Sequence, residues 1–507
     1  MKSAALARVG DTVRQGTIEH KPTRFAVAAF AVVLGLAVTF YAAPLVPFGL
    51  VGAVTGLLVG IALVVIGLRN PVWAFVFLIV SMFVRAALPK FLPTDPFLFA
   101  FAGLIVSTIF WVAAQPERRI RFGAVELTMA LYVLWNIHSI LTPHEYRPII
   151  YPLTEETLSV TRYLLIGTAI PFATYVISRA IFNTERAMRI LIAAILGCSA
   201  YSAWVSILQF HGPRALVWPR YIVDTPGWEG RANGLPNQPE VNGLILTVGF
   251  VLALVLLGMK DQPRWRKPIY VAITAACGYG VFLTHTRAIW LGFAVIIIMG
   301  LVLAKGYRAG FVITTLGVVG YIVMNWSTFT SADRDAGGVG STNEVFDRLN
   351  AAATALWAFS EKPFTGWGLG RFVSVNTYHH QQWSPQTKWE RGLGIPAHLN
   401  ELGILAELGL IGLLLWLTVL FLVSKKLLSS YRSLPERGIL GRPVGFAALT
   451  AFVSIVLAGL FVDLRMFDYP STMVMALVGA TVGTAERLTR PYELPPDPLR
   501  PLRKTPL

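Results

Sequence analysis

The sequence has 507 residues, of which 55% are hydrophobic and 14% charged, and its formal net charge at pH 7 is +16. A water-soluble fold has no place for so large an apolar fraction, so this composition excludes a soluble protein and indicates a membrane protein whose apolar side chains face lipid. The positive charge does not indicate nucleic-acid binding, because Lys and Arg fall in short segments between apolar runs, where such residues anchor a membrane protein.

Fourteen segments are apolar and long enough to cross a bilayer as helices, since about 20 helical residues span about 30 Å of hydrocarbon. In chain order they are 25–43, 48–68, 71–88, 95–114, 122–141, 160–180, 187–210, 240–259, 268–285, 288–304, 309–325, 399–423, 443–462 and 470–486. Arg85 shortens the third segment, and the last is rich in Gly, Ala and Thr. The sequence therefore predicts an all-α integral membrane protein, a polytopic bundle of about 12–14 transmembrane helices.

Three regions follow from this pattern. Residues 1–23 form a basic segment expected in the cytoplasm, residues 24–486 form the polytopic transmembrane domain, and residues 487–507 form a Pro-rich cytoplasmic tail. No small-residue cleavage site follows the first apolar run, so we expect a retained helix and not a signal peptide. Cys198 and Cys277 lie in apolar runs and predict neither a disulfide framework nor a zinc site.

The basic residues of the short loops predict the orientation, because positive residues stay on the cytoplasmic side. They concentrate in every second connection, as Arg69, Arg118, Arg119, Arg121, Arg179, Arg186, Arg189, Lys260, Arg264, Arg266, Lys267, Lys305, Arg308, Lys425, Lys426, Arg432, Arg437 and Arg442. An even number of helices with both termini in the cytoplasm satisfies this pattern. The other connections, including the long segments 211–239 and 326–397, are then external.

The longer external segment, residues 326–397, is predicted to be folded. Long loops in compact proteins are commonly functional. This one carries the tryptophans Trp357, Trp367, Trp383 and Trp389, together with the apolar stretch NAAATALWAF, which has helical character. We expect a partly helical cap that lies on the membrane and forms part of a functional site.

Three arginines fall on the predicted external side. Arg231 lies in the segment GRANGLPNQPEVNG together with Asn237, Arg287 lies at a helix boundary in LTHTRAIWLG, and Arg348 opens the apolar stretch of the large loop. Each alone has an ordinary explanation, because boundary arginines anchor helices by snorkelling and loop arginines are solvated. Together they suit a diphosphate, since guanidinium groups match phosphate oxygens and stay charged at physiological pH.

His398, in IPAHLNELGILAELGLIG, lies where the large loop re-enters the membrane. Histidine titrates near neutrality and can act as a general base. Asn400 and Glu401 follow it, and Glu401 at i+3 is expected to share a helical face with His398. A histidine that only caps a helix start explains the pattern equally well.

A very short external turn, VDLRMFDYP, contains Asp463, Arg465 and Asp468. A carboxylate there could orient a histidine or take a proton itself, or it could form an ion pair with Arg465. Neither a DxD-type carboxylate pair nor a Walker lysine loop occurs on this side. We therefore expect no metal site and no cofactor.

At these positions the sequence resembles the O-antigen ligase and polymerase superfamily of bacterial inner-membrane glycosyltransferases. HLNELGILAELGLIG resembles the family's histidine motif, in which Gly follows eleven residues after the histidine and a second small residue three later, here His398, Gly409 and Gly412. Four more pieces follow the family's order, namely RANGLPNQPEVNG, LTHTRAIW with Thr286 where Ser is usual, RLNAAATALW, and KPFTGWGLGRF with a P-x-x-G-x-G pattern. Leu399 departs from the family, because a polar residue usually follows the histidine.

The resemblance implies a GT-C-like bundle in the bacterial inner membrane and a metal-independent, inverting glycan transfer at its periplasmic face. The implied donor is a glycan carried on undecaprenyl diphosphate. His398 would be the catalytic base, and Asp463 or Asp468 a second catalytic residue. The implied residues for diphosphate and substrate binding are Arg231, Arg287, Arg348, Asn237 and Asn400.

Two acceptors fit the same donor chemistry. A ligase transfers the glycan to the lipid A core, and a polymerase joins it to a second lipid-linked glycan to build O-antigen or exopolysaccharide; the His–Gly–Gly spacing favours the ligase. Membrane lipids and a chain-length regulator or envelope assembly proteins are further expected partners, and nucleic acid is not.

Other classes of protein also have many apolar helices. A lipid-linked oligosaccharide transporter or flippase would carry charged residues deep in its spans and show repeat symmetry. Glu126 is the main acidic residue inside an apolar run, and no internal repeat is visible. A scaffold for an envelope assembly complex is a third interpretation.

Overall fold

The computed structural model describes residues 70–87, 96–113, 120, 122–150, 156–304, 306–333 and 336–489. All of them belong to one unit, residues 67–507. The predicted spans 25–43 and 48–68, the segment 1–23 and the tail from residue 490 lie outside the described residues.

Each of the other twelve predicted spans coincides with a helix. The long helices are α4 (Pro71–Val84), α5 (Pro96–Ala113), α6 (Ala124–Leu141), α8 (Ile170–Ile181), α9 (Glu185–His211), α11 (Pro239–Gly258), α12 (Lys267–Leu283), α13 (Arg287–Leu303), α14 (Arg308–Met324), α18 (Asn400–Ser433), α19 (Arg442–Gly459) and α20 (Asp468–Thr489). The short helix α7 (Val160–Leu164) and the π-helix η2 (Leu165–Ala169) continue directly into α8, so the three form one span. Prolines in the first turn start several of these helices, where their missing N–H is not needed.

Shorter elements connect the spans. They are the 3-10 turns η1 (Arg85–Ala87), η3 (Arg214–Leu216), η4 (Arg264–Arg266) and η5 (Leu464–Met466), and the helices α10 (Tyr221–Asp224), α15 (Trp326–Thr330), α16 (Asn343–Glu361) and α17 (Phe372–Tyr378). In the described ranges β-structure is limited to an isolated bridge between Ile149 and Thr157.

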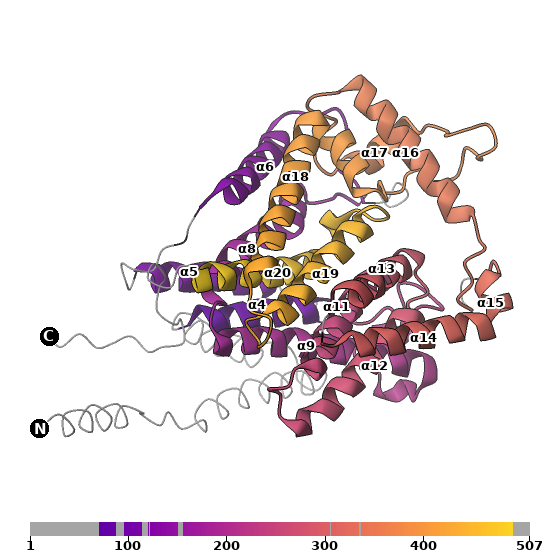
Figure 1. Cartoon of the computed structure of the whole chain (residues 1–507). Helices are drawn as coiled ribbons and strands as arrows, with labels where there is room; N and C mark the ends of the chain where they lie inside the picture. Colours follow the sequence, from indigo (N-terminus) through magenta and orange to yellow (C-terminus); the bar gives the residue numbers. More distant parts are fainter. Residues whose placement is uncertain are drawn as a thin grey trace, which may run out of the picture. The chain divides into compact units, whose positions relative to one another are not determined.

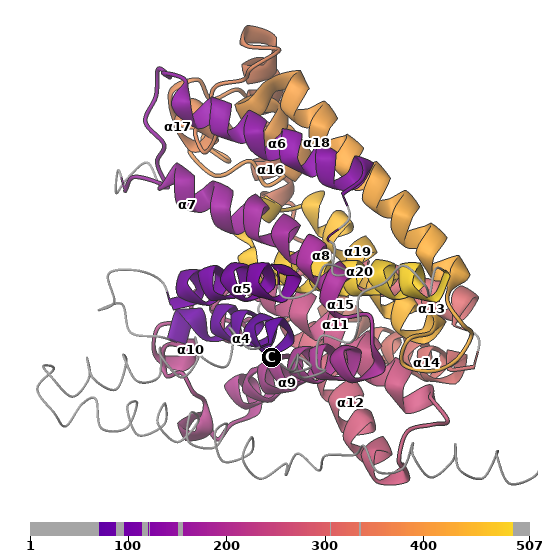
Figure 2. The same ribbon diagram turned by 90° about the vertical axis from the view of Figure 1, so that its left-hand side faces the viewer.

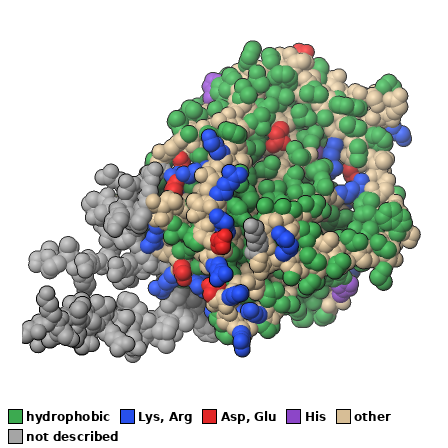
Figure 3. Space-filling view, viewed as in Figure 1, with side chains coloured by type: hydrophobic (Ala, Val, Ile, Leu, Met, Phe, Trp, Pro, Cys, Tyr) green, Lys and Arg blue, Asp and Glu red, His purple; other side chains and the backbone are tan. Residues whose placement is uncertain are grey.

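Among the described residues, six helical spans are long and apolar enough to cross a membrane, and four shorter apolar helices accompany them. The prediction of an all-α polytopic membrane protein is therefore confirmed. α11 is the most enclosed of the six, with 89% of its 18-residue window buried, whereas only 33% of the α6 window is buried. Leu127, Leu131 and Leu134 of α6 are exposed, and apolar side chains cover much of the surface in Figure 3. Such a surface requires lipid around it.

The composition of the last span is explained by its packing against α8. α20 is buried from Tyr469 to Ala485. A Cβ atom at Gly479 or Gly483 would overlap the backbone of α8 at Tyr175 and Arg179. Small residues let two helices approach closely in a membrane, where apolar side chains gain little from burial against one another. The Gly, Ala and Thr content that weakens the hydropathy signal thus permits this close contact between α20 and α8.

Contacts between the described segments bring several helix ends together at two ends of the bundle. At one end, called here the loop end, the Tyr163 hydroxyl donates to Asp463 at 2.8 Å, Gln209 donates to the Arg231 carbonyl at 2.7 Å, and Arg85 pairs with Asp468. At the other end Arg179 pairs with Glu126 and Glu486. Glu126, the acidic residue within a predicted span, therefore lies in an ion pair away from the loop end.

The large loop is a folded cap at the loop end. α16 and α17 lie beside the first half of α18 (Figures 1 and 2). They share a small apolar core that includes Ala351, Ala355, Trp367 and Phe372. The stretch NAAATALWAF lies within α16, so its predicted helical character is confirmed.

The segment that follows α16 is bound to a kink in α18. Gly409 has φ 67° and interrupts the helix. Beside the kink, the Trp367 N–H donates to the Ala406 carbonyl at 2.9 Å, and the Leu410 N–H donates to the Pro363 carbonyl at 2.8 Å. Gly366, at φ 68°, leaves no room for a side chain against the Glu407 backbone. The P-x-x-G-x-G pattern is thus a docking segment that fixes the cap on α18.

Candidate functional site

His398 occupies the bend between the cap and α18. Its φ of 34° is in the left-handed region, which non-glycine residues rarely adopt and which occurs often at functional sites. The helix begins only at Asn400, after the extended residue Leu399. The prediction that His398 and Glu401 share a helical face is therefore wrong, because His398 precedes the helix.

The surroundings of His398 favour its neutral form. Burial of the ring and the positive charge of Arg348 lower its pKa from 6.5 to about 4, and the negative charge of Asp463 acts in the opposite direction. At neutral pH the imidazole therefore carries no charge and has one nitrogen able to accept a proton.

Arg348 connects the histidine to the other arginines. It projects from the first half of α16, is half-buried, and places its guanidinium 5.7 Å from the centre of the Phe461 ring. Burial lowers its pKa, the charge of Arg287 lowers it further, and Glu240 and Asp347 raise it. Arg348 thus interacts electrostatically both with His398 and with Arg287.

Arg287 begins α13 and points toward the cap. Its Nη1 donates to the Ser341 carbonyl at 2.6 Å, and its Nη2 lies 3.8 Å from the Glu344 carboxylate. Nε and Nη2 are buried and have no hydrogen-bond partner among the described residues. A buried donor without a hydrogen bond costs about 1–3 kcal/mol, more when it is charged. The Glu344 carboxylate is too far from Nη2 for a hydrogen bond, so both donors can still bind an anion that approaches more closely.

Arg231 lies on the segment that packs against the start of α13. It is buried, and its guanidinium lies 5.0 Å from the centre of the Trp228 ring. The Ala232 N–H donates to the Leu283 carbonyl at 2.8 Å, which joins this segment to the turn that carries Arg287. The three predicted arginines therefore come from three separate segments that meet at the loop end.

The two predicted asparagines serve the fold in this structure. The Asn237 side chain accepts from the Gly227 N–H at 2.8 Å and donates to the Thr225 carbonyl at 3.2 Å, within its own loop. Asn400 accepts from the Leu464 N–H at 3.2 Å. Asn400 thus joins the start of α18 to the turn before α20, while its predicted role toward a substrate stays a prediction.

The two candidate aspartates lie in different surroundings. Asp463 receives two hydrogen bonds from the Arg465 guanidinium, at 2.9 and 2.7 Å, so the ion-pair alternative is what the structure contains. Its charge also acts on His398. Asp468 pairs instead with Arg85 at the end of α4. Of the two, Asp463 is the carboxylate that belongs to the surroundings of His398.

Two further charged residues complete these surroundings. Glu407 accepts from Arg465 Nη1 at 2.7 Å, and Glu240 interacts with Arg348. The sequence around these two glutamates does not indicate a site. Glu407 lies within an apolar span, and Glu240 follows a proline at a helix start. Only long-range contacts identify them.

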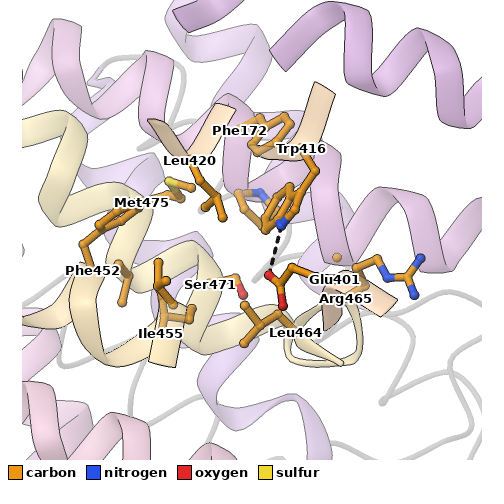
Figure 4. Close-up of a pocket in the computed structure, with 14 residues that line it drawn as sticks. Phe172, Glu401, Trp416, Leu420, Phe452, Ile455, Leu464, Arg465, Ser471 and Met475 are labelled. Atoms are coloured by element: carbon orange, nitrogen blue, oxygen red, sulfur yellow. Dashed lines mark hydrogen bonds between the residues drawn. The ribbon is translucent and has the colours of Figure 1, made fainter. Parts of the chain in front are cut away.

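An apolar cavity lies next to Arg465, between α8, α18, α19 and α20 (Figure 4). Phe172, Trp416 and Phe452 line it, and Glu401 lies at its edge, where it accepts from the Trp416 indole N–H at 3.3 Å. Glu401 is thus directed to this cavity, which is lined mostly by apolar side chains together with Arg465 and Ser471. In the described part of the chain, no group of three or more His, Cys, Asp or Glu residues is placed to hold a metal ion.

Comparison with known proteins identifies part of this region. Residues 270–417 match the family model described as O-antigen ligase. The match extends from α12 into α18 and includes Arg287, Arg348 and His398, while Arg231 and Asp463 lie outside it. No curated protein matches the chain.

Proposed function

Because residues 270–417 match the family model described as O-antigen ligase, we propose that the chain transfers a glycan from undecaprenyl diphosphate to an acceptor hydroxyl. We place this reaction at the periplasmic face of the bacterial inner membrane, with both termini in the cytoplasm. The observation that carries the proposal is the pair of buried Arg287 donors, Nε and Nη2, which make no hydrogen bond among the described residues. Arg287 also interacts electrostatically with Arg348, and Arg348 with a neutral His398.

His398 is the proposed general base. The acceptor oxygen attacks the anomeric carbon while its proton moves to the His398 ring. The bond from the anomeric carbon to the diphosphate oxygen breaks, and the diphosphate leaves with the electron pair. Attack opposite the leaving group inverts the configuration at that carbon.

Arg287, Arg348 and Arg231 are the proposed diphosphate ligands. Negative charge develops on the leaving diphosphate in the transition state, and fixed guanidinium donors stabilise it without reorganisation. They supply the positive charge that a metal ion supplies in other diphosphate sites, so we propose that the reaction needs no metal and no cofactor.

A bound donor would also make His398 a stronger base. The positive charge of Arg348 lowers the pKa of the free histidine. A diphosphate beside Arg348 offsets that charge, so the pKa of His398 rises toward neutral values when the donor binds. The pKa of His398 is then close to neutral pH, where a general base is most effective, only when the donor is bound.

The proposed acceptor is the lipid A core, as for a ligase. The alternative is a second lipid-linked glycan, as for an O-antigen or exopolysaccharide polymerase. Purified protein is incubated with undecaprenyl-diphosphate glycan, with and without lipid A core. Transfer that requires the core identifies a ligase, longer lipid-linked chains formed without the core identify a polymerase, and no product in either arm contradicts the proposed transfer.

A further inference from the structure

One buried cluster at the loop end contains more negative than positive charge. Arg465 is 3% exposed, Asp463 7% and Glu407 3%. These three residues, called here the charge cluster, carry one positive and two negative formal charges. Ionised groups are costly to bury unless partners compensate them, so an excess carboxylate in such a place calls for an explanation.

The contacts of the cluster are well defined. Arg465 donates through Nε and Nη2 to both oxygens of Asp463, at 2.9 and 2.7 Å, and through Nη1 to Glu407 at 2.7 Å. The second Glu407 oxygen accepts from the Phe372 N–H of the cap at 3.0 Å. Tyr163 of α7 donates to Asp463 at 2.8 Å. One guanidinium thus holds two carboxylates, one from α18 and one from the turn between α19 and α20.

The cluster is also fixed by its backbone. A Cβ atom at Gly167 of the π-helix η2 would overlap the backbone of Arg465. A Cβ atom at Gly403 would lie 2.9 Å from both Arg465 Nη2 and the Cβ of Ala397, and 3.7 Å from Asp463 Oδ2, so the cluster packs close to the residue that precedes His398. π-helical turns are rare and occur frequently at functional sites. Asn400 holds the same turn from α18. The Asp463 carboxylate therefore has a single position set by three helices.

We propose that Arg465 and Glu407 are positioning residues for the transfer reaction, which hold Asp463 so that the excess negative charge of the cluster acts on His398 and stabilises its protonated ring. This inference rests on the proposed function. In the transfer step the proton of the acceptor hydroxyl moves to His398, the new bond forms from the acceptor oxygen to the anomeric carbon, and the diphosphate leaves with the electrons of the old bond. The ring is then an imidazolium beside the positive charge of Arg348. The negative charge of the cluster compensates the repulsion between these two cations.

The charged groups near His398 come from three elements. Arg348 belongs to α16, Asp463 to the turn before α20, and Glu401 to the start of α18. The charges of Arg348 and Asp463 act on the ring in opposite directions, whereas Glu401 is directed to the apolar cavity and to Trp416. Asp463 is thus the carboxylate that acts on His398, and Arg465 and Glu407 act through it.

The test is the pH dependence of kcat/KM in Glu407→Gln. This change removes one negative charge and leaves the Arg465–Asp463 pair in place. With less negative charge behind Asp463, His398 binds a proton less readily, so the acid limb of the profile moves to lower pH by about half a unit to one unit. The plateau falls about tenfold, since the imidazolium is less stabilised in the transition state. The pH at which the acid limb lies does not depend on how much protein is folded. If Glu407 served only the fold, Glu407→Gln would lower the plateau of kcat/KM and leave the acid limb at the wild-type pH.

Glu401→Gln is the matched control. It removes a carboxylate three residues from His398 that does not belong to the charge cluster, and its limb is expected to stay at the wild-type pH. An equal shift in Glu401→Gln and Glu407→Gln would overturn the proposal. So would an unmoved limb in Glu407→Gln.

Tyr163→Phe gives a second test if Glu407→Gln fails to fold. It removes the hydrogen bond that disperses the Asp463 charge and changes no formal charge, so the limb moves to higher pH. A limb that stays at the wild-type pH or moves lower contradicts the proposal. Failure of the proposed function looks different: in that case the wild-type protein transfers no glycan, or His398→Ala retains both the activity and the acid limb.

Discussion

The backbone N–H of Gly368 donates to the carbonyl oxygen of Glu407 at 2.8 Å. This bond joins the cap segment between α16 and α17 to α18, two residues before the kink at Gly409, and the side chain of the same Glu407 holds Arg465. The cap and the charge cluster are therefore fixed at one residue. A change in how the cap docks is expected to alter the surroundings of His398 as well.

Gly366→Ala tests the docking of the cap. The position has φ 68°, and a Cβ atom there would overlap the Glu407 backbone. Left-handed strain alone costs about 1–3 kcal/mol, and the overlap adds to it. We expect a clearly lower melting temperature in detergent and a large loss of transfer. Gly317→Ala on α14 is the control, because nothing lies within 4 Å of a Cβ atom there. Equal melting temperatures for the two variants would contradict this account of the motif.

Arg287→Lys tests the diphosphate site. Lysine keeps the positive charge, but it cannot replace the fork of donors that leaves Nε and Nη2 directed to an anion. We expect the transfer rate to fall about tenfold to a hundredfold, with unchanged amounts of protein in the membrane. Arg189→Lys, an exposed residue paired with Glu185, is expected to keep wild-type activity. A fully active Arg287→Lys would remove the basis for bidentate recognition.

The stability of the protein should depend on pH through His398. Its pKa is about 4 in the folded protein and 6.5 without the fold. Below pH 6.5 the unfolded chain binds a proton that the folded protein does not, so the stability contributed by the neutral histidine is present above pH 6.5 and is lost as the pH falls toward 4. We expect the melting temperature to fall between pH 7 and pH 5, and to fall less in His398→Ala. An identical decrease in both proteins would show that His398 does not contribute.

Chelation tests the proposal that arginines replace a metal ion. Transfer by protein treated with EDTA is expected to stay within about twofold of the untreated rate. The rate is measured with the same donor and acceptor before and after Mg²⁺ is returned. A loss on chelation that Mg²⁺ restores would assign the diphosphate site to a metal.

The sequence predicted the spans well because hydropathy depends on local composition. All twelve predicted spans in the described residues are helices, including α20, whose weak signal reflects its close packing on α8. The sequence also predicted that four candidate site residues lie at one end of the bundle, namely Arg231, Arg287, Arg348 and His398. This prediction was possible because each span that crosses the membrane moves the chain to the opposite end, so counting the spans assigns each connection to an end.

The finer geometry of the site depends on contacts that no local pattern contains. Asn400 binds a backbone N–H 64 residues away, and Glu407 binds Arg465 58 residues away. The prediction that His398 and Glu401 share a helical face was wrong, because α18 begins two residues after the histidine. Sequence spacing could not choose between Asp463 and Asp468 either, whereas their partners Arg465 and Arg85 separate them.

The most direct test of the central claim is glycan transfer by His398→Ala in a reconstituted system. Purified wild-type and variant proteins are compared with an undecaprenyl-diphosphate glycan donor and lipid A core, at equal amounts of folded protein. Removal of the general base predicts a loss of transfer of at least about a hundredfold, with expression and membrane insertion unchanged. Wild-type rates from His398→Ala would contradict the mechanism.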